Sequence, residues 1–94
     1  MSILRIEHPV ADYAAWKQAF DADPVGRERL GVRSYRVMRP VDNERYVLVD
    51  LEFESSEEAD GLLTAMRDVW SRVTGSLISD PRARIVENVE TKTY

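Results

Sequence analysis

A chain of 94 residues is long enough for one domain with a modest core, and its 44% hydrophobic content indicates a globular protein. It has no cysteine, which excludes disulfides, thiolate nucleophiles and the common zinc sites. The net charge of −4 disfavours a nucleic-acid partner, and no apolar run is long enough to span a membrane. We therefore expect a single domain over residues 1–94 and a cytoplasmic location.

The chain begins with a predicted strand. Residues 3–8 alternate in polarity, and Leu4, Ile6 and His8 share one face. Pro9 ends the pattern because it lacks an amide hydrogen for the sheet.

A helix is predicted next. Asp12 is a suitable N-cap for a helix that begins near Tyr13. One apolar stripe follows at helical spacing, formed by Tyr13, Trp16 and Phe20. Asp23-Pro24 is expected to introduce a kink, followed by one or two helical turns through Leu30 that end at Gly31.

The middle of the chain is predicted to form a hairpin. Residues 32–39 and 45–53 have strand composition, and the segment between them, PVDNE, contains typical turn residues. In the second strand the odd positions suit the side facing the helices; they are Val47, Val49, Leu51 and Phe53. Tyr35 and Val37 join that side if the hairpin pairs in the even register.

A second helix and a last strand complete the pattern. Ser55 and Glu58 form a capping box, which indicates a helix start. Apolar residues then recur at helical spacing: Ala59, Leu62, Leu63, Met66, Val69, Trp70, Val73 and Leu77. Gly75 and the Ser79-Asp80-Pro81 turn are expected to close this helix, and residues 84–91 read as the last strand.

The predicted order β-α-β-β-α-β indicates an α+β, ferredoxin-like fold. With right-handed crossovers, it gives a four-stranded antiparallel sheet with both helices on one face. The other face would carry a mixed set of side chains: Arg36, Met38, Tyr46, Leu48, Asp50 and Glu52. Such a face commonly meets a second copy of itself, so we expect a homodimer through the sheets. Its expected contacts are Tyr46 and Leu48, with Arg36 and Asp50 forming an ion pair within or between chains.

Three segments together resemble the dimeric α/β-barrel superfamily, closest to its antibiotic-biosynthesis-monooxygenase-like and small cyclase-like branch. They are DYAAWKQAFD after the first strand, GVRSYRVMRPVDNERYVLVDLEF in the hairpin, and SSEEADGLLTAMRDVW in the second helix. The resemblance spans residues 3–89 and depends mainly on positions that determine the fold.

The resemblance implies a homodimer whose two sheets close into a barrel, with a ligand cleft between the sheet and helices of each subunit. Activities known in this superfamily include cofactor-independent oxygenation of polycyclic phenols, haem degradation, polyketide cyclisation and lactone isomerisation. The haem-degrading members pair an Asn on the first strand with a Trp and a His on or after the second helix. This pattern does not carry over, because the first strand here has no Asn and no His follows Trp70. The oxygenase members place Asn, Trp and Tyr around a phenol, and Asn88, Trp70 and Tyr35 are the candidates here.

His8 and Tyr35 are the candidate catalytic residues. The imidazole of His8 suits proton transfer near neutral pH, and its strand parity points it toward the expected cleft. The alternative is that His8 caps or hydrogen-bonds the neighbouring loop. Tyr35 carries a hydroxyl that needs a partner if it is buried.

Trp70, Met66 and Asn88 are the candidate ligand-binding residues. Met66 and Trp70 lie four residues apart on one helical face, and such pairs line adaptable pockets as well as cores. The Tyr13, Trp16 and Phe20 stripe is more simply explained as core. The sequence contains no metal-ligand cluster, so no metal site and no cofactor are expected.

Two functional hypotheses remain. In the first, the protein binds a small apolar or aromatic molecule in the cleft and acts as a cofactor-independent monooxygenase or a cyclase. In the second, it is a non-catalytic binding or assembly module whose aromatic residues are simply core.

Overall fold

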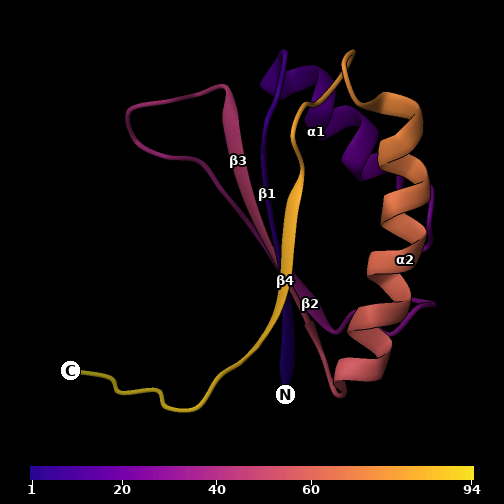
Figure 1. Cartoon of the computed structure of the whole chain (residues 1–94). Helices are drawn as coiled ribbons and strands as arrows, with labels where there is room; N and C mark the ends of the chain where they lie inside the picture. Colours follow the sequence, from indigo (N-terminus) through magenta and orange to yellow (C-terminus); the bar gives the residue numbers. More distant parts are fainter.

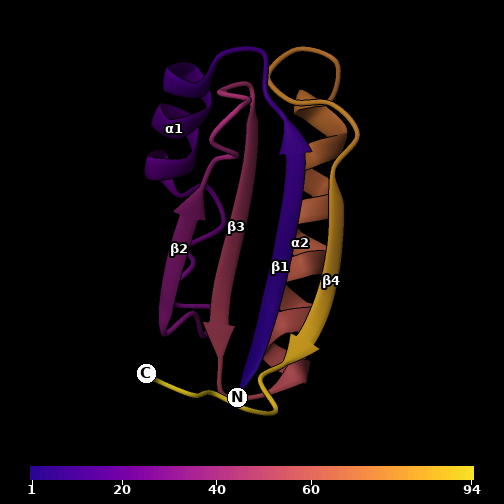
Figure 2. The same ribbon diagram turned by 90° about the vertical axis from the view of Figure 1, so that its left-hand side faces the viewer.

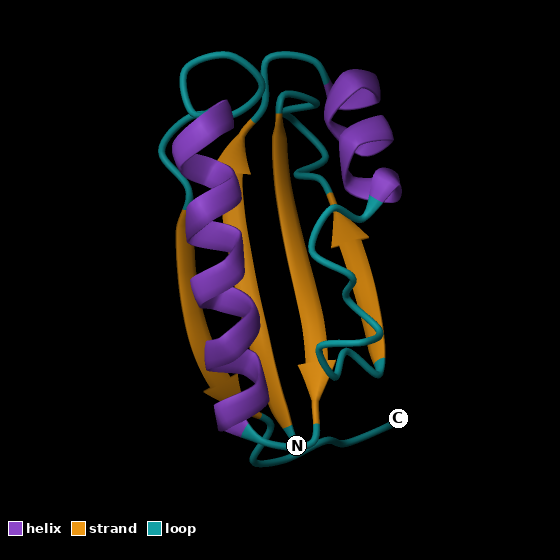
Figure 3. Ribbon diagram, turned by 90° about the vertical axis from the view of Figure 1, so that its right-hand side faces the viewer, coloured by secondary structure: helices purple, strands orange, loops and turns teal.

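The computed structural model describes residues 1–94, and the predicted ferredoxin-like fold is confirmed (Figure 1). In chain order the elements are β1 (Ser2–Pro9), α1 (Tyr13–Ala22), β2 (Ser34–Met38), β3 (Tyr46–Phe53), α2 (Ser56–Val73) and β4 (Arg82–Glu87). The strands form one antiparallel sheet in the order β2-β3-β1-β4. Both helices lie on the same face of this sheet (Figure 3). None of the helices is both long and apolar enough to cross a membrane.

The strand register confirms the predicted division of the sheet into two faces. Tyr35 pairs with Leu51 and Val37 with Val49, which is the even register of the hairpin. The side chains on the helix face of β1 and β3 are buried, and those on the opposite face remain without a covering element (Figure 2). We call this second surface the open face.

The core lies between the sheet and α2. Its fully buried members on the strands include Leu4, Val47, Val49, Leu51 and Phe53. α2 contributes Ala59, Leu62, Leu63 and Trp70 from the predicted apolar stripe. The two helices begin as predicted, since the Asp12 and Ser55 side chains accept hydrogen bonds from backbone N–H groups three residues on.

The segment after α1 forms turns rather than the predicted extra helix. Asp23 ends α1 in the left-handed region at φ 52°, and Gly26 adopts a second positive φ of 71°. A right-handed helix cannot continue through such a residue, so residues 24–31 fold as consecutive turns. Gly31, the expected end of this segment, also has a positive φ.

Three other boundaries differ from the prediction. α2 ends at Val73, and the Thr74 hydroxyl donates to the Trp70 carbonyl, so Leu77 lies in the following turn. β4 covers Arg82–Glu87 rather than residues 84–91, and Glu87 pairs with Ser2, the first residue of β1. β2 is shorter than the predicted strand over residues 32–39.

Asp50 is buried on the open face and forms its ion pair within the chain with Arg5, so the predicted pair with Arg36 within the chain is wrong, and the pair between chains stays a prediction. The Arg5 Nε and Nη2 atoms each donate to the Asp50 carboxylate at 2.8 Å. Arg36 stands opposite Asp50 on the other neighbouring strand but forms no ion pair in this chain. Arg5 on β1 presents two parallel donors to the carboxylate, which is the bidentate geometry that arginine favours. These hydrogen bonds lower the pKa of Asp50 despite the opposing effect of burial, and the charges of Arg5 and Arg36 add to the lowering.

His8 is buried on the helix face of β1, with only 2% of its surface exposed. Its Nδ1 lies 3.1 Å from the Pro9 carbonyl oxygen. Because that oxygen can only accept, we assign the proton of the neutral ring to Nδ1. Burial lowers the pKa of His8, and hydrogen bonds to the backbone oppose this effect only in part.

Because folding lowers the pKa of both His8 and Asp50, we expect the free energy of unfolding to decrease in two separate steps as the pH falls. The unfolded chain protonates its histidine near pH 6.5, whereas the folded chain resists, so the free energy of unfolding decreases as the pH falls below about 6.5. The stabilisation from Asp50 is present above its unfolded pKa and is lost only below about pH 4. Urea unfolding at a series of pH values measures both steps.

A separate variant tests each of the two steps. His8→Gln removes the only histidine of the chain and should flatten the curve between about pH 5 and 6.5. Arg5→Met should reduce the step at lower pH and leave the histidine step in place. A wild-type stability that stays constant from pH 7 to 5 would contradict the buried, neutral state of His8.

Candidate functional site

Four aromatic side chains, Tyr13, Trp16, Phe20 and Tyr35, form a continuous row between α1 and the sheet. The ring centroids of Tyr13 and Trp16 lie 5.9 Å apart, those of Trp16 and Phe20 5.1 Å, and those of Phe20 and Tyr35 5.1 Å. At its centre, Trp16 also meets the edge of the buried His8 ring at 6.0 Å. We call these four residues the aromatic row; it connects α1 to the sheet through favourable ring contacts.

Arg27 packs on the aromatic row at the end formed by Phe20 and Tyr35. Its guanidinium carbon lies 3.9 Å from the centroid of the Phe20 ring and 5.1 Å from that of Tyr35. Its Nη1 donates to the Phe20 carbonyl at 2.7 Å, and its backbone N–H donates to the Asp23 carboxylate at 2.9 Å. The arginine therefore holds the last turn of α1 and the following turns together, by stacking and by hydrogen bonding.

An apolar cleft of about 360 Å³ opens between α1, α2 and the sheet. Trp16 and Phe20 contribute to one wall, Met66 and Trp70 of α2 to the other, and Leu51 of β3 reaches it from the sheet. Twelve of its fifteen lining residues are hydrophobic, and the remaining three are Pro24, Arg27 and Arg72. We call this space the apolar cleft. Its size and composition are those of a site for a small organic molecule.

The chemistry available inside the apolar cleft is limited. No Asp, Glu, His, Ser, Thr or Tyr lines it. The cleft can exclude water and hold a flat apolar molecule between aromatic and thioether groups. It offers no carboxylate or imidazole as a general base within its own walls.

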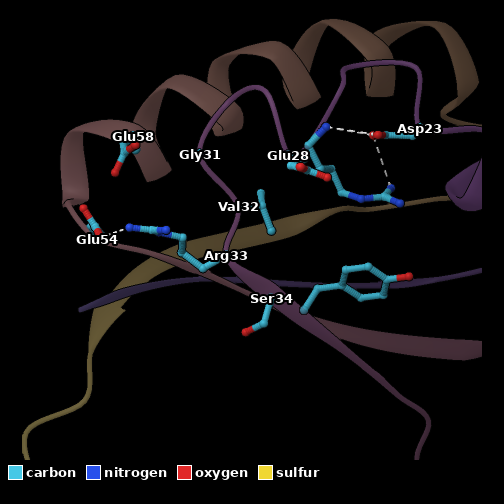
Figure 4. A pocket seen from close by; sticks show the side chains of 10 residues that line it. Asp23, Glu28, Gly31, Val32, Arg33, Ser34, Glu54 and Glu58 are labelled. Atoms are coloured by element: carbon cyan, nitrogen blue, oxygen red, sulfur yellow. Dashed lines mark hydrogen bonds and ion pairs between the residues drawn. The ribbon is translucent and has the colours of Figure 1, made fainter.

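A second, polar groove lies beside residues 23–35 (Figure 4). It has about 640 Å³ and ten lining residues, of which only two are hydrophobic. Arg33 and Glu54 form an ion pair across it, and Asp23 contacts Arg27 at its end. The groove is larger than the apolar cleft, but four carboxylates and two arginines line it, and it gives an apolar molecule little to contact. We therefore take the apolar cleft as the candidate site.

The structure brings two of the five predicted site residues into the apolar cleft. Trp70 and Met66 line it, as the i, i+4 spacing suggested. His8 lies behind Trp16 and does not line the cleft. Tyr35 lines the polar groove, and Asn88 lies beyond β4, where its amide donates to the Thr91 hydroxyl. The roles of these five residues in binding or catalysis stay predictions.

Sequence reasoning missed three members of this site. Trp16 is buried, as predicted for core, but it also forms part of the cleft wall. Neither Arg27 nor Arg72 was predicted to line the site. The helical spacing of Val69, Arg72 and Val73 places Arg72 at the margin of the apolar stripe, which is the one signal the sequence contains.

No protein-family model matches this chain, and no curated protein has significant sequence similarity to it. Solved structures do match. A variant of SnoaB, a cofactor-independent oxygenase from Streptomyces nogalater, superimposes with a TM-score of 0.77 at 11% identity, covering 96% of this chain and 94% of its own. The ActVA-Orf6 monooxygenase of Streptomyces coelicolor, solved with the ligand nanaomycin D, has a TM-score of 0.66 at 18% identity, covering 99% and 91%.

A dimeric ferredoxin-like protein from an uncultured marine organism also matches, with a TM-score of 0.70 at 6% identity and complete coverage of both chains. At these identities the likeness establishes the fold alone. The architecture anticipated from the three sequence segments is thus confirmed: the chain has the ferredoxin-like fold of the antibiotic biosynthesis monooxygenase-like structures.

Proposed function

We propose that this protein binds a small, flat aromatic molecule in the apolar cleft. The observation that carries the proposal is the cleft itself, in which two tryptophans, a phenylalanine and a methionine surround about 360 Å³ of space. A molecule of two or three fused rings would stack against Trp16 and Trp70 and displace water from apolar walls. Both tryptophans of the chain line this space.

The fold shared with SnoaB and ActVA-Orf6 supports a cofactor-independent oxygenation of a polycyclic phenol as the reaction. In such a reaction the substrate itself reduces oxygen. A ring methylene activated by the neighbouring phenol becomes a quinone carbonyl, one oxygen atom of O₂ enters that carbonyl, and the other leaves as water with the two methylene hydrogens. The protein's part would be to orient the rings, exclude bulk water and accept a proton.

His8 and Tyr35 remain the proposed proton-transfer residues. His8 contacts Trp16 and does not itself line the cleft, so it would act only if the Trp16 ring turned aside. Tyr35 packs edge-on against Phe20 at the other end of the aromatic row and is 46% exposed. Its hydroxyl could exchange protons with solvent while its ring stays packed.

A non-catalytic binding protein is the second candidate function. The absence of any acid or base among the lining residues favours it, because binding needs only the apolar walls. A cyclase, which also needs a proton donor or acceptor beside the substrate, is less well supported by this lining. Binding is common to all of these functions, so it is tested first.

Narrowing the mouth of the apolar cleft should weaken ligand binding. Ala19 is exposed on α1 and lines the cleft, so Ala19→Phe fills part of the space with little effect on the core. We expect the Kd for 2-naphthol, measured by isothermal titration calorimetry, to rise by about tenfold or more, the order of a steric mismatch in an apolar pocket.

Ala14→Phe is the matched control. Ala14 is also exposed on α1 but does not line the cleft, so this variant should bind 2-naphthol as the wild type does. No binding of 2-naphthol to the wild type, or equal weakening by both variants, would refute the proposed site.

A measurement of oxygen consumption distinguishes the oxygenase function from the non-catalytic binding function. With a hydroxylated anthrone as substrate and no added cofactor, an oxygenase should take up one O₂ per quinone formed. We expect His8→Ala or Tyr35→Phe to lower the rate by about 10²-fold if that residue transfers the proton. Unchanged turnover in either variant would remove that residue from the mechanism, and absence of uptake with intact binding would favour the non-catalytic function.

We further infer that two copies pair through their open faces. This face combines apolar side chains with charged ones, and no element of the chain covers it (Figure 2). Its apolar members are Ile3, Met38, Tyr46, Leu48 and Val86. A neighbour of the same fold is a dimeric protein, which supports the pairing of two copies. In the dimer, Arg36 would lie near the buried Asp50 and could contact the second copy.

Charge reversal at Arg36 should therefore weaken the dimer. Arg36→Glu places a carboxylate opposite Asp50 inside the proposed interface, and we expect the dimer Kd to rise by about 30-fold or more in sedimentation experiments. Arg67→Glu makes the same charge change on the exposed surface of α2 and should leave the dimer intact. A wild-type protein that sediments as a monomer at micromolar concentration would rule out this interface.

A further inference from the structure

The charged residues that line the apolar cleft are all positive, although binding of an apolar molecule requires no charge. The chain carries 17 acidic and 13 basic residues, for a net charge of −4. Yet the only two charged residues that line the cleft are both arginines, Arg27 and Arg72. A ligand with a negative group would therefore meet two guanidinium groups at the walls, although each also has a carboxylate beside it, Asp23 for Arg27 and Asp68 for Arg72.

Arg27 is largely withdrawn from solvent, with 14% of its side chain exposed. It borders both the apolar cleft and the polar groove, and its guanidinium stacks on the Phe20 ring. A guanidinium has five N–H donors. Here Nη1 donates to the Phe20 carbonyl and lies 3.6 Å from the Asp23 carboxylate, while Nε and Nη2 donate no hydrogen bond within the chain. The Nε and Nη2 groups of Arg27 therefore remain able to donate to a ligand that lies beside the aromatic rings.

Arg72 is the second arginine that could contact an anionic ligand. It lies in the last turn of α2, on the opposite wall, and its side chain is 69% exposed. Its single ion pair, with Asp68 at 2.9 Å, is on the surface and therefore contributes little free energy. The side chain can exchange this contact for an anion at the cleft mouth at small cost.

We propose that the ligand of the apolar cleft is an aromatic anion, and that Arg27 and Arg72 select it. This inference rests on the proposed function, since it specifies the ligand of the same site. The fused rings occupy the apolar interior, where an ionised group would lose its hydration without compensation. A carboxylate, phenolate, enolate or sulfonate on the ring therefore lies toward the arginines, which offer charge-assisted hydrogen bonds.

Two dyes that differ by one anionic group test the inference. 8-Anilinonaphthalene-1-sulfonate carries a sulfonate, and N-phenyl-1-naphthylamine has the same ring skeleton without it. Both are titrated into the folded full-length protein, and energy transfer from Trp16 and Trp70 reports binding near the cleft. The measured quantity is the ratio of the two Kd values, so that changes in apolar contact cancel.

Arg27→Gln should weaken binding of the sulfonate dye by about tenfold, and Arg72→Gln by about threefold because that arginine is more exposed. The ratio of the Kd for the sulfonate dye to the Kd for the uncharged dye should rise by these factors, because any loss of apolar contact affects both dyes. Arg67→Gln removes the same charge from the same helix away from the cleft and should leave both Kd values unchanged.

Arg27 also fastens the end of α1, so its replacement could disturb folding. Arg27→Lys keeps the charge and should retain most of the preference for the sulfonate dye. If Arg27→Gln does not fold, Arg72→Gln alone decides the question, because the only ion pair and hydrogen bond of the Arg72 side chain are with the exposed Asp68.

The outcomes separate this inference from the proposed function. If both dyes bind and the Kd ratio is the same in wild type, Arg27→Gln and Arg72→Gln, the anion selectivity is wrong and the apolar site stands. The same conclusion follows if only the uncharged dye binds. If neither dye binds the wild type, the inference and the proposed site both fail.

Discussion

The aromatic row is the interaction on which the rest of this structure depends. α2 lies close to β1, β3 and β4 and forms the core with them, whereas α1 reaches the sheet mainly through aromatic side chains. Large rings hold the α1 backbone away from the strands. Space therefore remains between α1 and α2, and Trp16 and Phe20 become a wall of that space as well as a part of the packing. The same residues secure the helix and shape the candidate site.

The fold could be predicted from sequence because each element has its own local signal. Asp12, Ser55 and Glu58 mark helix starts, and the alternation of Val47, Val49, Leu51 and Phe53 fixes the buried side of β3. Two of the errors depend on residues that are distant in sequence, whereas the turns after α1 follow from the left-handed residues Asp23 and Gly26. β4 ends at Glu87, opposite the first residue of β1, and Asp50 pairs with Arg5, which is 45 positions away in sequence.

The candidate site was less predictable for a related reason. Met66 and Trp70 could be paired from their spacing on one helix, but the apolar cleft also requires α1, the turns after it and residues near Leu77. Arg27 could not be placed there, because its position follows from the left-handed residues Asp23 and Gly26. His8 was expected on the helix face and is found there, yet the same periodicity could not reveal that it contacts Trp16 and does not line the cleft.

This fold makes an apolar space from its own packing, and the only charged residues that line this space are two arginines. Such a site would select by shape and charge, and it leaves any redox chemistry to the substrate. The likeness to oxygenases of the same fold is consistent with this division of labour, although identity of 11–18% ties the chain to them only through architecture.

Nuclear magnetic resonance tests the central claim, that aromatic molecules occupy the apolar cleft, most directly. 2-Naphthol is titrated into labelled protein while the indole N–H signals of Trp16 and Trp70 and the methyl signal of Met66 are followed. The account predicts saturable shifts of all three signals, with the amides of Ser34 and Glu54 in the polar groove unaffected. Shifts confined to the polar groove, or none at any of these positions, would contradict it.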